Sequence, residues 1–317
     1  MPETRRPSAA WINRHPEILS LLGLILLCAV MACISDRFFT WDNLSNVGRQ
    51  VSINAIIAIG MTFVILTGGI DLSVGAVMSL SMTLAAGSML AGVPVPLAVL
   101  IGLGTGALFG ALNGALVAYA RLPAIIVTLA TMEIPRGIAL LYTGGYPKSG
   151  LPDSFAAIGR GESLGMQNPI LIMLLVFLAA HVLLTQFPLG RYFYGLGGNE
   201  EALRLSGVRV QRCKFIAYAL SGLAASVSGL VLSSRLMSGQ PNAGLGFELD
   251  AIAAVVLGGT SITGGRGSVI GTLIGALMLG VLNNGLNLMD VSPYMQKVLK
   301  GVIILLAIYA GTAKRER

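Results

Sequence analysis

The sequence predicts an all-α membrane protein that crosses the bilayer about ten times. Of its 317 residues, 55% are hydrophobic and only 11% are charged, and its mean hydropathy is +0.80, which is too apolar for a soluble domain. A helix needs about 20 apolar residues to cross the hydrocarbon core. Several candidate stretches are shorter, so we expect one or two to be broken or re-entrant. The predicted spans are residues 18–34, 51–67, 72–92, 94–119, 122–142, 168–187, 213–233, 248–264, 268–289 and 295–311.

Basic residues predict the orientation. With the N-terminus inside, most of the 21 Lys and Arg residues fall in inner segments, which places those segments in the cytoplasm. We therefore expect one transmembrane domain over residues 18–311, with cytoplasmic tails over residues 1–17 and 312–317. This topology accounts for the net charge of +7, so the lipid bilayer is an expected partner and nucleic acid is not.

Two polar stretches interrupt the hydrophobic pattern. Residues 143–167 form a predicted outer loop, and residues 188–212 form a predicted cytoplasmic segment. Within the cytoplasmic segment, Asn199 suits an N-cap position, acidic residues follow in the first turn, and Gly207 stops the helix. A short amphipathic helix between two spans is a contact surface for a soluble partner. The alternative is a solvated connecting loop.

An internal similarity indicates inverted repeats. Residues 106–114 of the fourth predicted span resemble residues 275–285 of the ninth. Spans five positions apart run in opposite directions, so spans two to five and seven to ten are predicted to be inverted repeats around a central path. The recurring glycines in both spans favour close packing of helix backbones.

Residue types needed for catalysis or for energy coupling are scarce. The chain has only two histidines and three cysteines, and none is spaced like a metal site. The phosphate-binding motif G-x-x-x-x-G-K-[ST] is absent. We therefore expect no enzyme activity, no metal and no cofactor in this chain.

Polar side chains within the predicted spans could line a solute path. Glu133 lies near mid-membrane, about 16 Å from the cytoplasmic end of its helix, and Arg136 shares its face; a solute path and a structural ion pair fit them equally. Asp71 can cap the next helix or contact solute. Asparagines in spans can join helices or offer weak sites for hydroxyl groups. The candidate path residues are Asn54, Asp71, Ser73, Asn113, Glu133, Arg136, Asn283 and Asn284.

Three long motifs are recognisable. Residues 49–75, 190–208 and 240–267, in this order, closely resemble the permease subunits of ribose-type bacterial ABC sugar importers, and the resemblance extends over residues from about 38 to 310. The motifs contain the runs Gly68-Gly69-Ile70-Asp71-Leu72-Ser73-Val74-Gly75, Gly197-Gly198-Asn199-Glu200-Glu201-Ala202-Leu203 and Glu248-Leu249-Asp250-Ala251-Ile252.

The resemblance implies a permease subunit in the bacterial inner membrane that translocates a monosaccharide, either a ribose-like pentose, a hexose or a related polyol. A periplasmic sugar-binding protein would deliver the solute, with residues 143–167 and 235–247 as candidate docking surfaces. A separate cytoplasmic ATPase subunit, holding ATP and Mg, would press on a coupling segment, and a second permease copy or a sister permease would complete a dimer. The residues implied in coupling are Gly198, Asn199, Glu200, Glu201, Ala202, Arg204, Leu205, Ser206 and Gly207.

One alternative stays open. A self-sufficient secondary transporter or facilitator is favoured by the inverted-repeat pattern and by the pair of Glu133 and Arg136. An acidic residue at position 133 also departs from the pattern of the resembling family. A contact between Glu133 and solute therefore does not follow from the resemblance.

Overall fold

The computed structural model describes residues 16–313. Within this range the architecture is helical, and the strands are two-residue segments, so the all-α prediction is confirmed. The two predicted tails lie outside the described residues, apart from their helical ends. Their cytoplasmic location stays a prediction.

Seven helices in the described part of the chain are long and apolar enough to cross a membrane. Each of them coincides with a hydrophobic run of the sequence. Such a run forms a helix in lipid because a helix satisfies every backbone hydrogen bond within its own segment. They are α2 (Pro16–Ile34), α3 (Trp41–Leu66), α5 (Val95–Ala118), α6 (Ala124–Thr143), α8 (Asn168–Gln186), α11 (Val210–Leu236) and α13 (Val269–Leu288).

Three other predicted spans correspond to α4 (Val74–Leu90), α12 (Phe247–Leu257) and α14 (Pro293–Ala313). At 17 and 11 residues, α4 and α12 are short for a crossing. The predicted span 248–264 is not one continuous helix, because α12 ends at Leu257 and Gly259 then adopts a left-handed φ of +87°. The total of about ten crossings stays a prediction.

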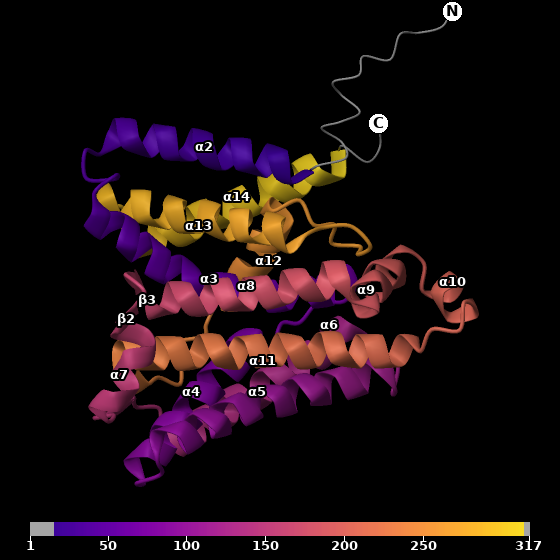
Figure 1. The fold of residues 1–317 in the computed structure, drawn as a ribbon, viewed down its shortest axis with the longest axis horizontal. Coiled ribbons are helices and arrows are strands. Elements are labelled where there is room, and N and C mark those ends of the chain that lie inside the picture. Colours follow the sequence, from indigo (N-terminus) through magenta and orange to yellow (C-terminus); the bar gives the residue numbers. More distant parts are fainter. Residues whose placement is uncertain (1–15, 314–317) are drawn as a thin grey trace, which may run out of the picture.

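The two polar stretches fold at opposite ends of the bundle (Figure 1). Residues 143–167 contain β1 (Lys148–Ser149), α7 (Asp153–Arg160) and the hairpin of β2 (Glu162–Ser163) and β3 (Met166–Gln167), and β1 pairs with β4 (Ser238–Gly239). The other stretch forms α9 (Pro188–Gly198) and α10 (Glu200–Leu205). Both are therefore ordered elements rather than unstructured loops.

The central helices are α3 and α11. Nearly every residue of α3 from Val51 to Leu66 is buried, and α11 packs against α3, α4 and α5 while α3 packs against α12 and α13. This crossed arrangement is the one expected when two repeats exchange their first helices. The inverted repeat itself stays a prediction.

Glycine sets the closest of these helix contacts. A Cβ atom added at Gly110 of α5 would lie 2.5 Å from the carbonyl oxygen of Tyr218 in α11, and one added at Gly106 would lie 2.4 Å from that of Gly222. Such separations exclude a side chain, so the small residues let the two backbones touch where lipid provides no hydrophobic drive.

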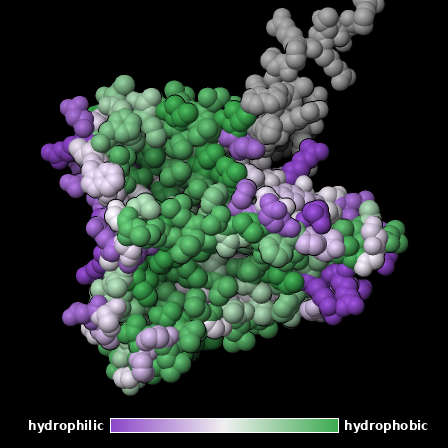
Figure 2. Space-filling view, in the orientation of Figure 1, coloured by the Kyte–Doolittle hydropathy of each residue, from purple (hydrophilic) through white to green (hydrophobic). Residues whose placement is uncertain are grey.

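A broad hydrophobic surface covers one face of the bundle. Figure 2 shows it between two ends rich in hydrophilic residues, over α2, α8 and α11. Large apolar side chains of these helices are exposed, such as Leu26 of α2 and Leu175 of α8. A surface of this extent is suited to the hydrocarbon core of a bilayer.

Candidate functional site

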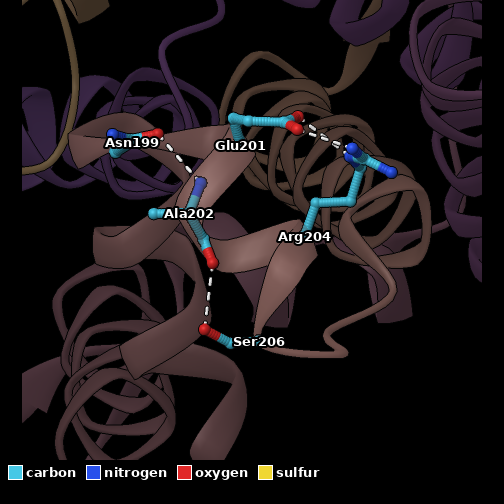
Figure 3. Close-up of polar contacts among 5 residues, drawn as sticks. All are labelled: Asn199, Glu201, Ala202, Arg204 and Ser206. Atoms are coloured by element: carbon cyan, nitrogen blue, oxygen red, sulfur yellow. Dashed lines mark hydrogen bonds and ion pairs between the residues drawn. The ribbon is translucent and has the colours of Figure 1, made fainter.

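Helix α10 lies at one end of the bundle (Figure 1), and Figure 3 shows the polar contacts that stabilise it. The Asn199 side chain accepts a hydrogen bond from the Ala202 backbone N–H at 3.0 Å, which is the N-cap contact that the sequence predicts. Ser206 donates its hydroxyl hydrogen to the Ala202 carbonyl at 2.9 Å. Gly207 then follows with a φ of +84°, which ends the helix. The predicted short helix and its N-cap are therefore present.

A charged pair lies on the exposed side of α10. The Arg204 guanidinium donates two hydrogen bonds to the Glu201 carboxylate, of 2.9 Å from Nε and 2.5 Å from Nη2. The hydrogen bond and the charge of Arg204 lower the pKa of Glu201 below its ordinary value. Leu205, also exposed, places an apolar side chain beside this pair. The helix thus offers both charge and apolar surface to a partner.

The connections of α10 lead into the bundle. Lys214 of α11 contacts Glu200 at 2.7 and 2.8 Å, and Leu203 lies against Gly195 of α9. At the end of α9, a Cβ atom added at Gly197 would lie 2.1 Å from the Leu66 carbonyl oxygen, which also accepts a hydrogen bond from the Gly265 N–H at 3.0 Å. The segment is therefore packed directly against the end of α3.

A buried carboxylate occupies the turn between α3 and α4. Asp71 is 1% exposed. Its Oδ1 accepts hydrogen bonds from the Ser73 N–H at 3.0 Å and the Ser73 hydroxyl at 2.6 Å, and its Oδ2 accepts one from the Ser221 hydroxyl at 3.0 Å. Ser73 precedes the first residue of α4, so Asp71 stabilises the turn and is not itself the N-cap.

The hydrogen bonds continue from Ser73 into two more helices. Asn113 of α5 donates to the Ser73 hydroxyl at 2.8 Å, and Thr131 of α6 donates to the Asn113 amide oxygen at 2.6 Å. Each of these side chains is buried. We call Asp71, Ser73, Asn113, Thr131 and Ser221 the polar network; it joins the turn before α4 to α5, α6 and α11.

A pocket of about 370 Å³ lies beside this network at the α10 end of the bundle. Its wall includes Gly69 and Tyr218 near the network, and Glu200 and Lys214 near α10. The Tyr218 hydroxyl donates to the Ile70 carbonyl at 3.4 Å. The pocket therefore lies between α10 and the turn that holds Asp71.

The other candidate path residues lie apart from the network. Arg136 contacts Glu133 at 3.2 Å on the exposed side of α6. Asn284 of α13 exchanges two amide hydrogen bonds, of 2.7 and 3.0 Å, with Asn43 of α3, which is the helix-joining role. The side-chain oxygens of Asn54 and Asn283 are buried and accept no hydrogen bond from the described residues.

Sequence reasoning missed several members of the site. Thr131 and Ser221 carry no local signal, because Ser and Thr are common in membrane helices and their pairing depends on tertiary packing. Gly197, Gly264 and Gly265 form the contact between α9 and the end of α3. These glycines lie within the second and third motifs. The motifs therefore indicated that both segments are important, but they did not predict that the segments contact each other.

Comparison with known proteins identifies the family to which the chain belongs. A family described as "Branched-chain amino acid transport system / permease component" matches residues 43–308. The ribose import permease protein RbsC of Escherichia coli is 50% identical over 310 residues, covering 96% of this chain and 96% of that protein. The same-named protein of Bacillus subtilis is 50% identical over 295 residues, covering 92% of each chain.

A third relative is more distant. The xylose transport system permease protein XylH of Escherichia coli is 36% identical over 370 aligned positions, covering 94% of each chain. No solved structure gives a significant match. The matches confirm the resemblance that the three motifs predict. The chain belongs to this family of transport-system permeases and is a multi-pass inner-membrane protein.

Proposed function

We propose that this chain is the membrane permease of an ABC importer for a monosaccharide, with ribose as the first solute to test. The observation that carries this proposal is the 50% identity, over almost the whole of both chains, to proteins named as ribose import permeases. Identity falls to 36% for the xylose permease. The description of the matching family names amino-acid transport, so family membership alone does not indicate the solute.

The proposed topology has both termini in the cytoplasm and about ten crossings, with α4, α12 and α14 completing the seven long spans. α10 then lies on the cytoplasmic side and α7 on the outer side. Inverted repeats would relate α3–α6 to α11–α14. The crossed packing of α3 and α11 supports this relation.

Energy is proposed to come from a separate cytoplasmic ATPase that carries ATP and Mg and contacts residues 198–207. The exposed pair of Glu201 and Arg204 and the exposed Leu205 supply mixed contacts of the kind found at protein interfaces. The ion pair of Glu200 with Lys214 then passes motion of α10 to α11. No cofactor is proposed for this chain.

A periplasmic sugar-binding protein is proposed to dock on α7 and the β2–β3 hairpin. α7 is held to α11 through the Gly159 N–H, which donates to the Ser234 hydroxyl, and through Arg160, which donates to the Arg235 carbonyl. Leu164 at the hairpin tip is 91% exposed. A rigid support with an exposed apolar tip suits a docking surface.

The solute path is proposed to run beside the polar network, between this chain and a second copy or a sister permease. In the described structure Asp71, Ser73 and Asn113 are bonded to one another and buried. Solute would therefore reach them only after these helices move apart. The proposed path is poor in charge, so its affinity for a neutral sugar would be low.

Reconstitution tests the proposal against a self-sufficient secondary transporter. Proteoliposomes that contain this chain, its ATPase and its binding protein should accumulate labelled ribose only when ATP is present on the side of the membrane that the ATPase faces. Omission of the ATPase or the binding protein should abolish accumulation. Uphill uptake by this chain alone would overturn the proposal and favour the secondary transporter.

A further inference from the structure

Three arginine residues surround a second pocket, of about 330 Å³, at the α10 end of the bundle. Arg121 belongs to the turn between α5 and α6, Arg209 is the N-cap residue of α11, and Arg212 lies in the first turn of α11. Gln211 and Tyr119 complete much of the wall. Because α5 and α11 pack against each other, the fold holds these two helix ends together and builds the pocket between them.

The positive charge of this pocket is not balanced by an acidic side chain. Within residues 16–313, no salt bridge is formed by Arg121, Arg209 or Arg212. Glu200, the acidic residue of the adjoining pocket, is already paired with Lys214 at 2.7 Å. Like charges around one pocket repel each other unless an anion lies between them, and guanidinium groups bind phosphate with paired N–H donors. The pocket is therefore suited to a phosphate group.

The pocket also lies at the depth of lipid headgroups. Both α5 and α11 are long and apolar enough to cross a membrane. Tyr119 directly follows the last residue of α5, and Arg209 directly precedes the first residue of α11. Tyrosine is enriched at membrane–water interfaces, and basic pockets between membrane helices bind anionic headgroups there. A phospholipid phosphate could thus reach the three guanidinium groups without leaving its leaflet.

An apolar stripe leads away from the pocket along α5. Leu108 and Leu112 are 67% and 41% exposed, and they precede Tyr119 by 11 and seven residues, which places all three on one side of the helix. An acyl chain along this stripe would cover the leucine side chains while its headgroup stayed in the pocket. A soluble phosphate would contact the pocket alone, so the stripe favours a lipid.

We propose that this pocket binds the phosphate headgroup of an anionic phospholipid such as phosphatidylglycerol, with one acyl chain along the exposed side of α5. Arg121, Arg209 and Arg212 contact the phosphate, and the Gln211 amide donates to the polar part of the headgroup. The bound lipid bridges the turn before α6 and the start of α11. The inference goes beyond the proposed function, because the site takes a membrane lipid whatever the solute is.

Lipid titration of the full-length chain in a neutral detergent tests the site, with native mass spectrometry as the measurement of bound lipid. Phosphatidylglycerol should bind about tenfold more tightly than phosphatidylcholine, whose headgroup has no net charge. Equal affinities for the two lipids would overturn the proposal.

A charge-matched pair of variants locates the binding. Arg121→Gln with Arg212→Gln removes one guanidinium from each side of the pocket and should lower the affinity for phosphatidylglycerol by about tenfold. The control is Arg191→Gln with Arg266→Gln, which removes two other exposed arginines that line neither pocket, and it should change the affinity by less than about twofold. Equal losses in the two variants would show unspecific attraction and overturn the site.

A single substitution keeps the test valid if the double variant does not fold. Arg209 is exposed, so Arg209→Gln should fold like the unmodified protein. It should still lower the affinity for phosphatidylglycerol by about threefold. An unchanged affinity would contradict the contact of this arginine with the phosphate.

Two further arms distinguish the other occupants. Inorganic phosphate in large excess should leave phosphatidylglycerol bound, because it lacks an acyl chain; complete displacement would make the pocket a soluble-anion site and overturn the lipid proposal. Co-purification of the ATPase subunit should be unaffected by Arg121→Gln with Arg212→Gln. Loss of the ATPase from this variant, with its lipid preference unchanged, would show that a protein surface covers the pocket and would also overturn the proposal.

The outcome is separate from that of the proposed function. Lipid binding is measured on the chain without transport, so a failure of ribose uptake would reject the function and leave the lipid site standing. Uptake of ribose combined with equal affinities for the two lipids would reject the lipid site and leave the function standing.

Discussion

The Nζ atom of Lys214 in α11 lies 2.7 Å from Oε2 of Glu200 in α10. This ion pair joins the short α10 to a helix of 27 residues, which is about 40 Å long at ~1.5 Å per residue. Because α11 packs against α3, α4 and α5, a displacement of α10 would act first on the centre of the bundle.

Loss of this ion pair should weaken coupling without loss of the protein. Lys214→Met keeps the length and the apolar part of the side chain. Because a partly exposed ion pair contributes little stability, the variant should still fold and insert. Ribose transported per ATP hydrolysed should fall by about threefold to fivefold. The measurement is uptake and phosphate release in the same proteoliposomes.

The matched control is the charge swap Glu200→Lys with Lys214→Glu. It keeps the pair with its signs exchanged and should recover most of the coupling ratio. An unchanged ratio in Lys214→Met would contradict the route through α11.

The N-cap of α10 should matter in the same assay. Asn199→Ala removes the acceptor for the Ala202 N–H and should destabilise this short helix by about 1 kcal/mol, so transport per ATP should fall while insertion is retained. Asn199→Asp keeps the acceptor and should behave like the unmodified protein. Equal losses in both variants would show that the amide, and not the cap, is required.

The proposed contacts of α10 with an ATPase subunit make a separate prediction. Replacing Glu200, Glu201 and Arg204 together by alanine should uncouple ATP hydrolysis from transport, because both ion pairs of the segment are lost. The permease should still insert, since none of the three side chains is buried. Unchanged transport by this variant would contradict a coupling role for residues 198–207.

The sequence predicts the helices better than the contacts between them. Hydrophobic runs give α3, α5 and α13 directly, because length and hydropathy suffice to satisfy a backbone in lipid. The break after Leu257 is different: it depends on Gly259 adopting a left-handed conformation, and a hydropathy window does not register one residue.

The residues of the candidate site also divide into those that local pattern predicts and those that depend on tertiary packing. Asn199 and Gly207 act on their own helix, and local pattern predicts them. The hydrogen bonds between Asp71 and Ser221 and between Asn113 and Thr131 join residues 150 and 18 positions apart in the chain, so only packing brings them together. Glu133 was predictable as a charge at mid-membrane, and its exposure was not.

The buried carboxylate should be more important for its hydrogen bonds than for its charge. Asp71→Asn keeps an oxygen that accepts from Ser73, and its amide can donate to Ser221, so the free energy of unfolding should change by less than about 1 kcal/mol. Asp71→Ala leaves the Ser73 and Ser221 hydroxyls without their acceptor and should cost about 3 kcal/mol. Thermal unfolding in detergent provides the comparison, and equal losses in the two variants would contradict this account.

Close packing of α5 on α11 makes the last prediction. Gly110→Ala places a methyl group 2.5 Å from the Tyr218 carbonyl oxygen. Because the nearest atoms on α11 all belong to the backbone, the helices must separate. We expect a loss of about 1–3 kcal/mol in the free energy of unfolding. Gly104→Ala lies on the same helix with nothing within 4 Å and should change it by less than about 0.5 kcal/mol. If Gly104→Ala is as damaging as Gly110→Ala, helix flexibility rather than the contact with α11 explains these glycines.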